Sequence, residues 1–475
     1  MSSLAKGSLL IAIGTIYKII LTILIDKYLA IQLGVEDYGK YKYGITIVLL
    51  ISTLSTLGFN SSIIRFIAIQ NSYDKKKTII TVSLILTFLV AILIVILALT
   101  GLPFFSISSP FLYATIFFAL NTLYSSIYSG LEKPNLKVWI NDVFGFTIYL
   151  MLLWTFFEFN RQSEEIAYVY LAYVFLVFIV NLYFSRTNYR KVKRSFFKGV
   201  LFNDYVSYTL PLFGVSILLI LSANLDKVVL NQFVSEKELG IYYSVFTISN
   251  LLPLILTILV FMYLPRMSKF IQKGKKRKAT LLSSYSSKWT MVIASMFFGS
   301  IFFYGKDLIS ILYTSSFIEG LLVLKILVFG QWINVSLGFT GQNLLALGDS
   351  KNQLYIRLLS FFIGFGLLFF GTKYYGSIGA AFSILFALLF SNSMQILVLK
   401  RKHQFIGYRR QNVYAFIIIL LIGFFLAYLH TFSFFNRLHF IISLVIDVLL
   451  YLSTLLIFRV LRKKDLKALN ITELG

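Results

Sequence analysis

The sequence predicts an all-α polytopic membrane protein with about fourteen transmembrane helices and an internal duplication. Of its 475 residues, 58% are hydrophobic and only 13% are charged, whereas soluble domains contain roughly 25% charged residues. The mean hydropathy is +0.83. Apolar stretches long enough to cross a bilayer recur along the whole chain, and two of them carry the same polar pattern. These observations predict two related bundles of membrane helices.

The duplicated pattern lies in the first and the seventh apolar stretch and in the segment after each. Asp26-Lys27 recurs as Asp226-Lys227, 200 positions later. The offset is 200 up to Glu36 and Glu236, and it becomes 201 from Gly39 and Gly240 onward because the second copy has one inserted residue. The other matched positions are Leu10, Gly14, Gln32, Glu36, Gly39, Tyr41 and Arg65 in the first copy, and Leu210, Gly214, Gln232, Glu236, Gly240, Tyr242 and Arg266 in the second. We therefore expect residues 8–200 and 206–400 to superpose about an axis roughly normal to the membrane, as parallel repeats do in many secondary transporters.

Fourteen apolar stretches are long enough for a transmembrane helix, which takes about 20 residues. They are 8–33, 43–68, 79–101, 110–130, 138–157, 166–184, 206–230, 241–264, 286–304, 321–345, 354–372, 377–399, 413–430 and 438–458. The run that begins at Ser8 continues without a small-residue cleavage site. The first helix is therefore expected to direct the chain to the membrane and also to remain as a membrane anchor.

Basic residues are concentrated in the even-numbered connections between these stretches, and the densest clusters lie in four of them and in the C-terminal tail. The clusters are Lys75-Lys76-Lys77, Arg190-Lys191 with Lys193-Arg194, Lys275-Lys276-Arg277-Lys278, Lys400-Arg401-Lys402 with Arg409-Arg410, and Arg462-Lys463-Lys464. Because cationic loops stay in the cytoplasm, both termini are predicted to be cytoplasmic, and Ser106, Gln162 and Phe233 to face outward. This topology accounts for the net charge of +25. Contact with anionic membrane lipids is a secondary expectation, and nucleic acid is not an expected partner.

The residue inventory excludes several kinds of chemistry. The chain has no cysteine, which rules out disulfides and thiolate ligands. It has no G-x-x-x-x-G-K-[ST] loop for a nucleotide. The three histidines, His403, His430 and His439, are expected to be isolated residues at the membrane interfaces and not metal ligands. We therefore predict no catalytic residue, no metal site and no cofactor, and we do not expect an enzyme.

Charged residues inside the apolar stretches are the candidate functional residues, because each costs at least roughly 2.5 kcal/mol at membrane depth. One face of the first helix carries four polar residues spaced by three or four: Thr15, Lys18, Thr22 and Asp26. Lys18 lies near the middle of that helix, where its ammonium reaches the interface only with difficulty. It is expected either to line a wet cavity or to form a structural pair with Asp142 or Asp226.

Other polar residues at membrane depth fall into three groups. The further cations are Arg65, Lys325 and Arg357, the amides are Asn121, Asn141, Asn334 and Asn343, and the further carboxylates are Asp142 and Asp226. Snorkelling to the cytoplasmic edge is an alternative explanation for Arg65 and Arg357. Similarly, Asp26-Lys27 and Asp226-Lys227 lie near the outer ends of their helices, where each pair could simply orient the following loop. The sequence leaves these alternatives open.

Several short motifs in a fixed order resemble those of a known family. The segment Leu29 to Phe66 contains Leu33-Gly34-Val35-Glu36-Asp37-Tyr38-Gly39-Lys40-Tyr41, then Leu57-Gly58-Phe59 and Ile64-Arg65-Phe66. It resembles the opening of Wzx-type polysaccharide biosynthesis flippases, which belong to the multidrug/oligosaccharidyl-lipid/polysaccharide (MOP) exporter superfamily. The likeness continues at Asp226 to Tyr243, Leu312 to Leu327, Asn343 to Lys351 and Tyr375 to Ala381. The order and spacing of these weak motifs carry the resemblance over nearly the whole chain.

The resemblance implies a MATE-like fold of two six-helix bundles, residues 1–200 and 201–410, around a central cavity. Residues 411–475 then form two additional helices and a basic cytoplasmic tail. The implied cargo is a polyprenyl-diphosphate-linked oligosaccharide, moved by alternating access from the cytoplasmic to the outer leaflet of the cytoplasmic membrane. Cations and amides suit a diphosphate and its sugars. The expected cavity cations are Lys18, Arg65, Lys325 and Arg357, and the expected polar cavity residues are Thr15, Thr22, Asn121, Asn141, Asn334 and Asn343.

The resemblance also has implications for the energy source of transport and for protein partners. Because the chain lacks a nucleotide-binding loop, an ion gradient is the expected energy source. Asp26, Asp142 and Asp226 are the candidates for coupling to H+ or Na+. A polysaccharide polymerase and a chain-length regulator are candidate partners.

Two other functions remain as alternatives. The first is a multidrug or metabolite antiporter of the same superfamily, whose cationic cargo would favour an acidic and aromatic cavity. Here lysine and arginine at membrane depth match or outnumber aspartate, which favours an anionic cargo. The second is a membrane-embedded polysaccharide polymerase or acyltransferase. Such an enzyme needs a large outer loop or a His/Asp site, and the sequence shows neither.

The predicted topology can be tested by cysteine labelling, because the native chain has no cysteine. We expect Ser106→Cys to react with a membrane-impermeant maleimide in intact cells. Lys275→Cys, in a basic connection, is the matched control and should react only after lysis. The reverse pattern would refute the orientation.

Overall fold

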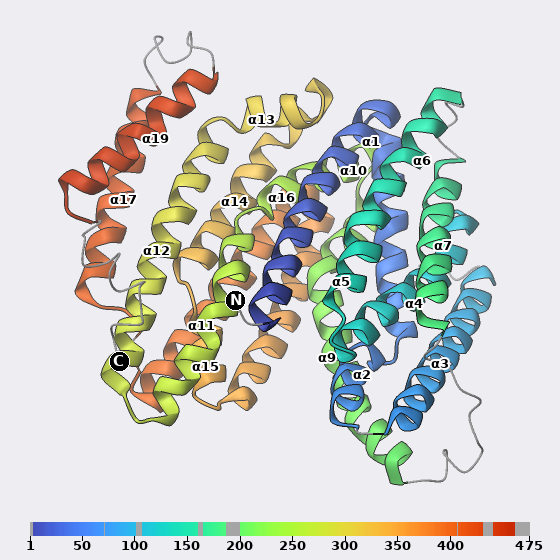
Figure 1. The fold of residues 1–475 in the computed structure, drawn as a ribbon. Helices are drawn as coiled ribbons and strands as arrows, with labels where there is room; N and C mark the ends of the chain where they lie inside the picture. The colour runs from blue at the N-terminus through green and yellow to red at the C-terminus, as the bar shows by residue number, and fades with distance from the viewer. Residues whose placement is uncertain are drawn as a thin grey trace. The chain divides into compact units, whose positions relative to one another are not determined.

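The computed structural model describes residues 3–70, 72–100, 107–159, 165–186, 200–405, 407–430 and 440–460. Every regular element in these ranges is a helix (Figure 1). The elements are α1 (Ser3–Ser55), α2 (Phe59–Ile69), α3 (Tyr73–Leu99), α4 (Ser109–Gly130), α5 (Pro134–Leu136), η2 (Lys137–Phe144), α6 (Gly145–Phe159), α7 (Ile166–Ser185), α9 (Val200–Phe233), α10 (Glu236–Ser249), α11 (Pro253–Gln272), α12 (Lys276–Phe303), α13 (Gly305–Leu312), η5 (Ser315–Gly320), α14 (Leu321–Ser336), α15 (Thr340–Ala346), α16 (Ser350–His403), α17 (Arg410–Leu429) and α19 (Phe440–Ile457). Ser106, Gln162, His439 and the basic residues at 190–194 and 462–464 lie outside the described ranges.

The chain is a multi-pass membrane protein. Among the described helices, nine are long and apolar enough to cross a membrane, or up to eleven if each of two bent pairs counts as one span. Each of the fourteen predicted stretches overlaps a described helix, but the stretch 241–264 falls on α10 and α11, which are not among these candidate spans. α1 and α16 contain 53 and 54 residues, a helical length of about 80 Å against a hydrocarbon core of roughly 30 Å. Each contains one glycine with non-helical backbone angles, Gly34 and Gly376, so each consists of two helices joined at a break.

Several predicted spans are interrupted rather than straight. The stretch 43–68 breaks at the turn before Phe59, where α1 and α2 differ in direction by 46°. The stretch 241–264 is divided between α10 and α11, and 321–345 between α14 and α15. Apolar content predicted these spans, but it does not register a local break, because broken helices remain equally hydrophobic.

The described residues divide into two compact units, Met1–Asn231 (unit 1) and Gln232–Gly475 (unit 2). In unit 1, α4 is central and contacts α1, α2, α3 and α7 (Figure 1). Amides join three of its helices: Asn181 Nδ2 of α7 donates to Asn121 Oδ1 of α4 and to Asn141 Oδ1 of η2, both at 3.1 Å. Asn121 Nδ2 donates to the Val174 carbonyl at 2.9 Å. Such hydrogen bonds satisfy polar groups where the bilayer offers no water.

A buried cluster of aromatic rings fixes the second half of α1. Tyr41 packs edge-on against Phe111 and Tyr170, and its hydroxyl is hydrogen-bonded to that of Tyr149. Tyr149 stacks on Tyr173 with ring centres 4.6 Å apart. All five rings are buried. They bind α1 to α4, α6 and α7 through large apolar surfaces.

α9 packs with unit 1. The predicted boundary at 200/201 would instead assign this helix to the second bundle. Tyr205 is hydrogen-bonded to Ser83 Oγ at 2.7 Å, and Thr209 Oγ1 donates to Ser62 Oγ at 2.8 Å. A Cβ at Gly58, where φ is +81°, would lie 2.7 Å from the backbone nitrogen of Phe213. These contacts hold α9 against α2 and α3.

In unit 2, α14 contacts α10, α12 and α16, and α11 packs against α12 and α15. Tyr263 of α11 stacks on Phe339 with ring centres 3.9 Å apart, inside a buried apolar cluster. The two C-terminal helices, α17 and α19, lie side by side and both contact α12 (Figure 1). They therefore belong to the packed structure of unit 2.

Glu238 of α10 closes the break in α16. Gly376 has φ 56° and ψ −138°, angles that are accessible to glycine and rarely to other residues. The next amide, Ser377 N, donates a hydrogen bond to Glu238 Oε1 at 2.7 Å. A Cβ at position 376 would lie 2.5 Å from that oxygen. The carboxylate thus satisfies an amide that the break exposes, and the glycine leaves room for it.

Asp349 joins the two ends of α16, which folds back on itself at Gly376. It caps the first half by accepting a hydrogen bond from Asn352 N, and its Oδ2 lies 3.1 Å from Lys402 Nζ and 2.6 Å from His403 Nε2 at the other end. Burial alone would raise the pKa of Asp349, but hydrogen bonds from His403, Asn352 and Lys402 hold that pKa well below the usual aspartate range. The hairpin is therefore closed by a carboxylate that stays charged.

The expectation of isolated histidines is wrong for both described ones. His403 pairs with Asp349, and His430 Nε2 lies 2.8 Å from Asp447 Oδ2, which also accepts a hydrogen bond from Tyr304 at 2.8 Å. Each histidine pairs with a carboxylate that is distant in sequence. The spacing of residues along the chain does not reveal such a pair.

Gly376→Ala is expected to lower the free energy of unfolding by about 1–3 kcal/mol, because the alanine Cβ is strained at these backbone angles. Thermal unfolding of the detergent-purified protein measures the effect. Gly366→Ala in the same element is the matched control, since nothing lies within 4 Å of a Cβ there. Similar effects of both substitutions would contradict the strain.

Candidate functional site

Lys18 lies beside a carboxylate and an aromatic ring, on the exposed side of α1. Its Nζ is 3.9 Å from Asp142 Oδ1 and 5.1 Å from the centre of the Phe146 ring. The Lys18 side chain is 46% exposed and that of Asp142 is 16% exposed. Close ion pairs of this kind have an N–O distance of about 2.7–2.9 Å. The contact is therefore loose, and it leaves the ammonium accessible to a second anion.

The other hydroxyls of the stripe are also accessible. Thr15 is exposed and Thr22 is half-exposed. Their Oγ1 atoms donate to the carbonyls of Ile11 and Lys18, each at 2.8 Å. A hydroxyl that donates in this way keeps lone pairs that can accept. This face of α1 suits water or a polar ligand better than it suits lipid.

Asp26, at the buried end of the same stripe, pairs with a residue that the sequence analysis did not single out. Lys42 Nζ, from the second half of α1, lies 2.9 Å from Oδ1 and 3.1 Å from Oδ2 of Asp26. The Asp26 side chain is 6% exposed and that of Lys42 is 17% exposed. Because the break at Gly34 folds α1 back, residues sixteen positions apart meet. The partner of Asp26 is thus Lys42 rather than the adjacent Lys27.

The second copy of the duplicated aspartate forms a similar pair nearby. Lys227 Nζ lies 3.0 Å from Asp226 Oδ1 and donates to the Ala223 carbonyl at 2.7 Å. Lys42 is close enough to Lys227 for the two charges to repel each other. We call Asp26, Lys42, Asp226 and Lys227 the four-charge cluster. Its formal charges cancel, as buried charges require.

The four predicted amides are used between helices. Asn121 and Asn141 both accept hydrogen bonds from Asn181. In unit 2, Asn343 Oδ1 accepts from the Tyr263 hydroxyl, and Asn334 Oδ1 accepts from Asn392 Nδ2 at 3.0 Å. The structure therefore gives each of these amides an interhelical partner.

The remaining predicted cations lie against aromatic rings or on the surface of their own unit. The Arg65 guanidinium lies 4.4 Å from the centre of the Tyr208 ring, and Lys325 Nζ lies 4.9 Å from that of Phe302. Arg357 is exposed on α16. Arg65 belongs to unit 1, and Lys325 and Arg357 belong to unit 2. Their convergence with Lys18 in one cavity stays a prediction.

Within the described ranges, no group of three or more His, Asp or Glu residues could hold a metal ion. The Lys18 ammonium is accessible to an anion, and the hydroxyls of Thr15 and Thr22 keep lone pairs that can accept hydrogen bonds. Sequence reasoning missed Lys42 and Asn181. Lys42 lies two positions from another lysine, Lys40, and nothing in the sequence marks it as partly buried. Asn181 is a single amide in an apolar helix, and this isolation is a signal that identifies it as a candidate.

A comparison with protein families agrees with the observed architecture. Residues 4–271, more than half of the chain, match the family of polysaccharide biosynthesis proteins. The chain belongs to this family. The capsular polysaccharide biosynthesis protein CapF of Staphylococcus aureus is 22% identical over 365 residues, which cover 74% of this chain and 89% of the relative.

Solved structures of membrane transporters share the fold. The lipid II flippase MurJ, in an inward closed conformation, aligns with a TM-score of 0.74 at 14% identity, over 95% of this chain and 99% of MurJ. An inward-facing multidrug resistance MATE transporter of the MOP superfamily aligns with a TM-score of 0.65 at 14% identity, over 81% and 93% of the two chains. The predicted all-α, MOP-type fold of this family member is confirmed.

Removing one member of a buried ion pair leaves the other charge uncompensated. Lys42→Met is therefore expected to lower the free energy of unfolding by about 3–5 kcal/mol, and a second change, Asp26→Leu, to recover much of this loss. Denaturation of the purified protein measures both effects.

Lys40→Met is the matched control, two positions away. Lys40 and Asp37 form a pair at 3.5 Å whose side chains are 53% and 35% exposed. Such a pair contributes at most about 1 kcal/mol. Equal losses for Lys42→Met and Lys40→Met would contradict the buried pair.

Proposed function

We propose that this protein is a flippase that moves a polyprenyl-diphosphate-linked oligosaccharide from the cytoplasmic to the outer leaflet of the cytoplasmic membrane. The observation that carries the proposal is family membership over residues 4–271, together with a fold that matches a lipid II flippase along 95% of the chain. The relative from Staphylococcus aureus is named for capsular polysaccharide biosynthesis. Polysaccharide units are assembled on lipid carriers, so a membrane transporter in such a family has a lipid-linked sugar as its natural cargo.

Lys18 supports an anionic cargo. A half-exposed ammonium in the middle of a membrane helix is costly unless water or an anion reaches it. Its contact with Asp142 is long, so a diphosphate would provide a stronger partner than the existing one. The exposed threonine hydroxyls on the same face would accept hydrogen bonds from sugar hydroxyls.

The four-charge cluster supports coupling to protons or sodium ions. Protonation of Asp26 or Asp226 would remove one negative charge and leave a buried lysine uncompensated, which is destabilising. The Asp26–Lys42 pair joins the two halves of α1, and the Asp226–Lys227 pair lies within α9, close enough for Lys227 to feel the charge of Lys42. Ion binding would thus favour a different arrangement of these helices, as alternating access requires.

A cation antiporter is the second candidate, and the MATE neighbour is the observation that favours it. The two candidates differ in the charge of the cargo. Transfer of a fluorescent polyprenyl-diphosphate sugar across reconstituted vesicles, measured beside uptake of a cationic dye, separates them. Movement of the dye without movement of the sugar lipid would overturn the flippase proposal.

Lys18→Ala is expected to lower the rate of sugar-lipid transfer roughly tenfold or more, because a charge-assisted contact contributes about 1.5–3 kcal/mol. Lys18→Arg should be better tolerated than Lys18→Gln, since a flexible headgroup needs the charge more than the shape. The transfer assay in vesicles with matched protein content measures all three.

A purely structural lysine would behave differently. Lys18→Ala would then lower protein abundance instead of specific activity, and Asp142→Asn in the same chain would restore abundance. Normal transfer by a stably expressed Lys18→Ala protein would end the proposed role of Lys18.

A further inference from the structure

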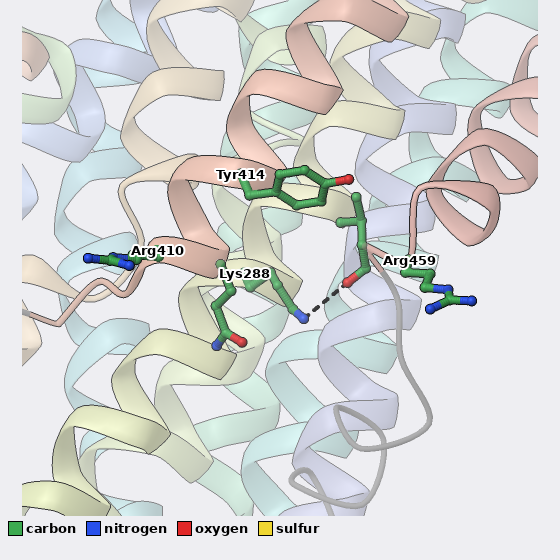
Figure 2. A pocket seen from close by; sticks show the side chains of 6 residues that line it. Lys288, Arg410, Tyr414 and Arg459 are labelled. Atoms are coloured by element: carbon green, nitrogen blue, oxygen red, sulfur yellow. Dashed lines mark hydrogen bonds between the residues drawn. The ribbon is translucent and has the colours of Figure 1, made fainter.

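A cavity of about 220 Å³ lies in unit 2 (Figure 2). It is lined by Lys288, Arg410, Gln411, Tyr414, Arg459 and Val460. Lys288 comes from α12, Arg410 opens α17 and Arg459 follows α19. Three helices that mutually contact thus each supply one cation.

The cations differ in how firmly they are held. Lys288 is only 2% exposed, and its Nζ donates to the Val460 carbonyl at 3.1 Å. Arg410 and Arg459 are exposed, and in Figure 2 their guanidinium groups extend to opposite sides of Lys288. The cavity therefore has a fixed ammonium at its base and two long cationic side chains at its rim. The lining contains no carboxylate among the described residues.

The end of α19 is shaped around this cavity. Arg459 adopts a left-handed backbone with φ 51°, which is uncommon for a residue with a Cβ. This turn brings Val460 back so that its amide donates to the Leu455 carbonyl at 2.9 Å and its carbonyl meets Lys288. Tyr414 holds the same segment by donating to the Phe458 carbonyl at 3.0 Å.

The cavity also lies at the level of the lipid headgroups. α17 and α19 are membrane spans, and the cavity takes Arg410 from the first residue of one and Arg459 from just beyond the last residue of the other. The charge pattern of the connections predicts that this level is the cytoplasmic edge. Anionic phospholipids present phosphate at this depth, and basic pockets between transmembrane helices on the cytoplasmic side bind such headgroups.

We propose that the cavity between α12, α17 and α19 binds the phosphate of an anionic phospholipid from the cytoplasmic leaflet. Lys288 contacts the phosphate from below, and the two exposed arginines turn toward it from the outward positions that Figure 2 shows, so that their N–H groups can donate to the phosphate. The acyl chains remain in the bilayer beside α17 and α19. The bound lipid would connect the two C-terminal helices to α12. This site is independent of the proposed cargo and of Lys18.

The test is native mass spectrometry of the delipidated full-length protein titrated with phosphatidylglycerol or with phosphatidylcholine of the same chain length. We expect phosphatidylglycerol to bind roughly tenfold more tightly, and Arg410→Gln/Arg459→Gln to weaken it by about tenfold, as for the loss of a charge-assisted contact. Lys276→Gln/Arg277→Gln is the matched control, because it removes two exposed cations near the start of α12. It should change the affinity less than about twofold, as surface charge pairs do.

A second variant separates binding from folding. Arg410→Gln removes one exposed cation at the first residue of α17, so it should weaken phosphatidylglycerol binding while the melting temperature of the same sample stays unchanged. No preference for phosphatidylglycerol, or equal losses in the double variant and its control, would overturn the proposal. So would full displacement of the lipid by millimolar inorganic phosphate, which would indicate a site for the free ion. A tenfold gain of lipid binding in Asp465→Asn/Glu473→Gln would identify the chain's own tail as the occupant, and would also overturn it.

Discussion

The cost of an uncompensated charge in a low-dielectric environment is the constraint on which this structure depends. A carboxylate or an ammonium that leaves water loses several kcal/mol of solvation, and only a close partner restores it. Asp26 with Lys42, and Asp226 with Lys227, satisfy this requirement at N–O distances of 2.9–3.0 Å. The pairs also fix the path of the chain, because Asp26 reaches Lys42 only when α1 folds back at Gly34.

The same constraint acts on the backbone wherever a membrane helix is interrupted. A break leaves amides and carbonyls without a helical partner, and those that are buried in the protein need another one. At Gly376 the carboxylate of Glu238 accepts the exposed Ser377 amide. At the other end of the same element, Asp349 caps the helix and pairs with His403. Polar residues outside the predicted site therefore hold the hairpin of α16 at both ends.

The sequence allowed the fold class to be predicted, because hydrophobic length and the alternation of basic connections depend on the bilayer and not on tertiary contacts. Apolar content located fourteen stretches, and described helices overlap all of them. The partners of individual side chains could be predicted less well from the sequence. The pairing of Asp26 with Lys42 depends on the break at Gly34, and the bond from Asn181 to Asn121 depends on how α7 lies against α4. Neither contact has a signature in spacing along one helix.

Two lysines of α1 differ in how firmly their charges are paired. Lys42 is 17% exposed and lies within 3.1 Å of both oxygens of its carboxylate, so an incoming anion would have to displace an existing partner. Lys18 is 46% exposed and its nearest carboxylate oxygen is 3.9 Å away. Because Coulomb energy falls with distance and with solvent access, the Lys18 pair is much the weaker of the two. An anionic cargo would gain more from Lys18 than from any charge in the four-charge cluster, while ion coupling would draw on the cluster. The two proposed roles therefore fall on different residues, cargo binding on Lys18 of α1 and ion coupling on the four-charge cluster of α1 and α9.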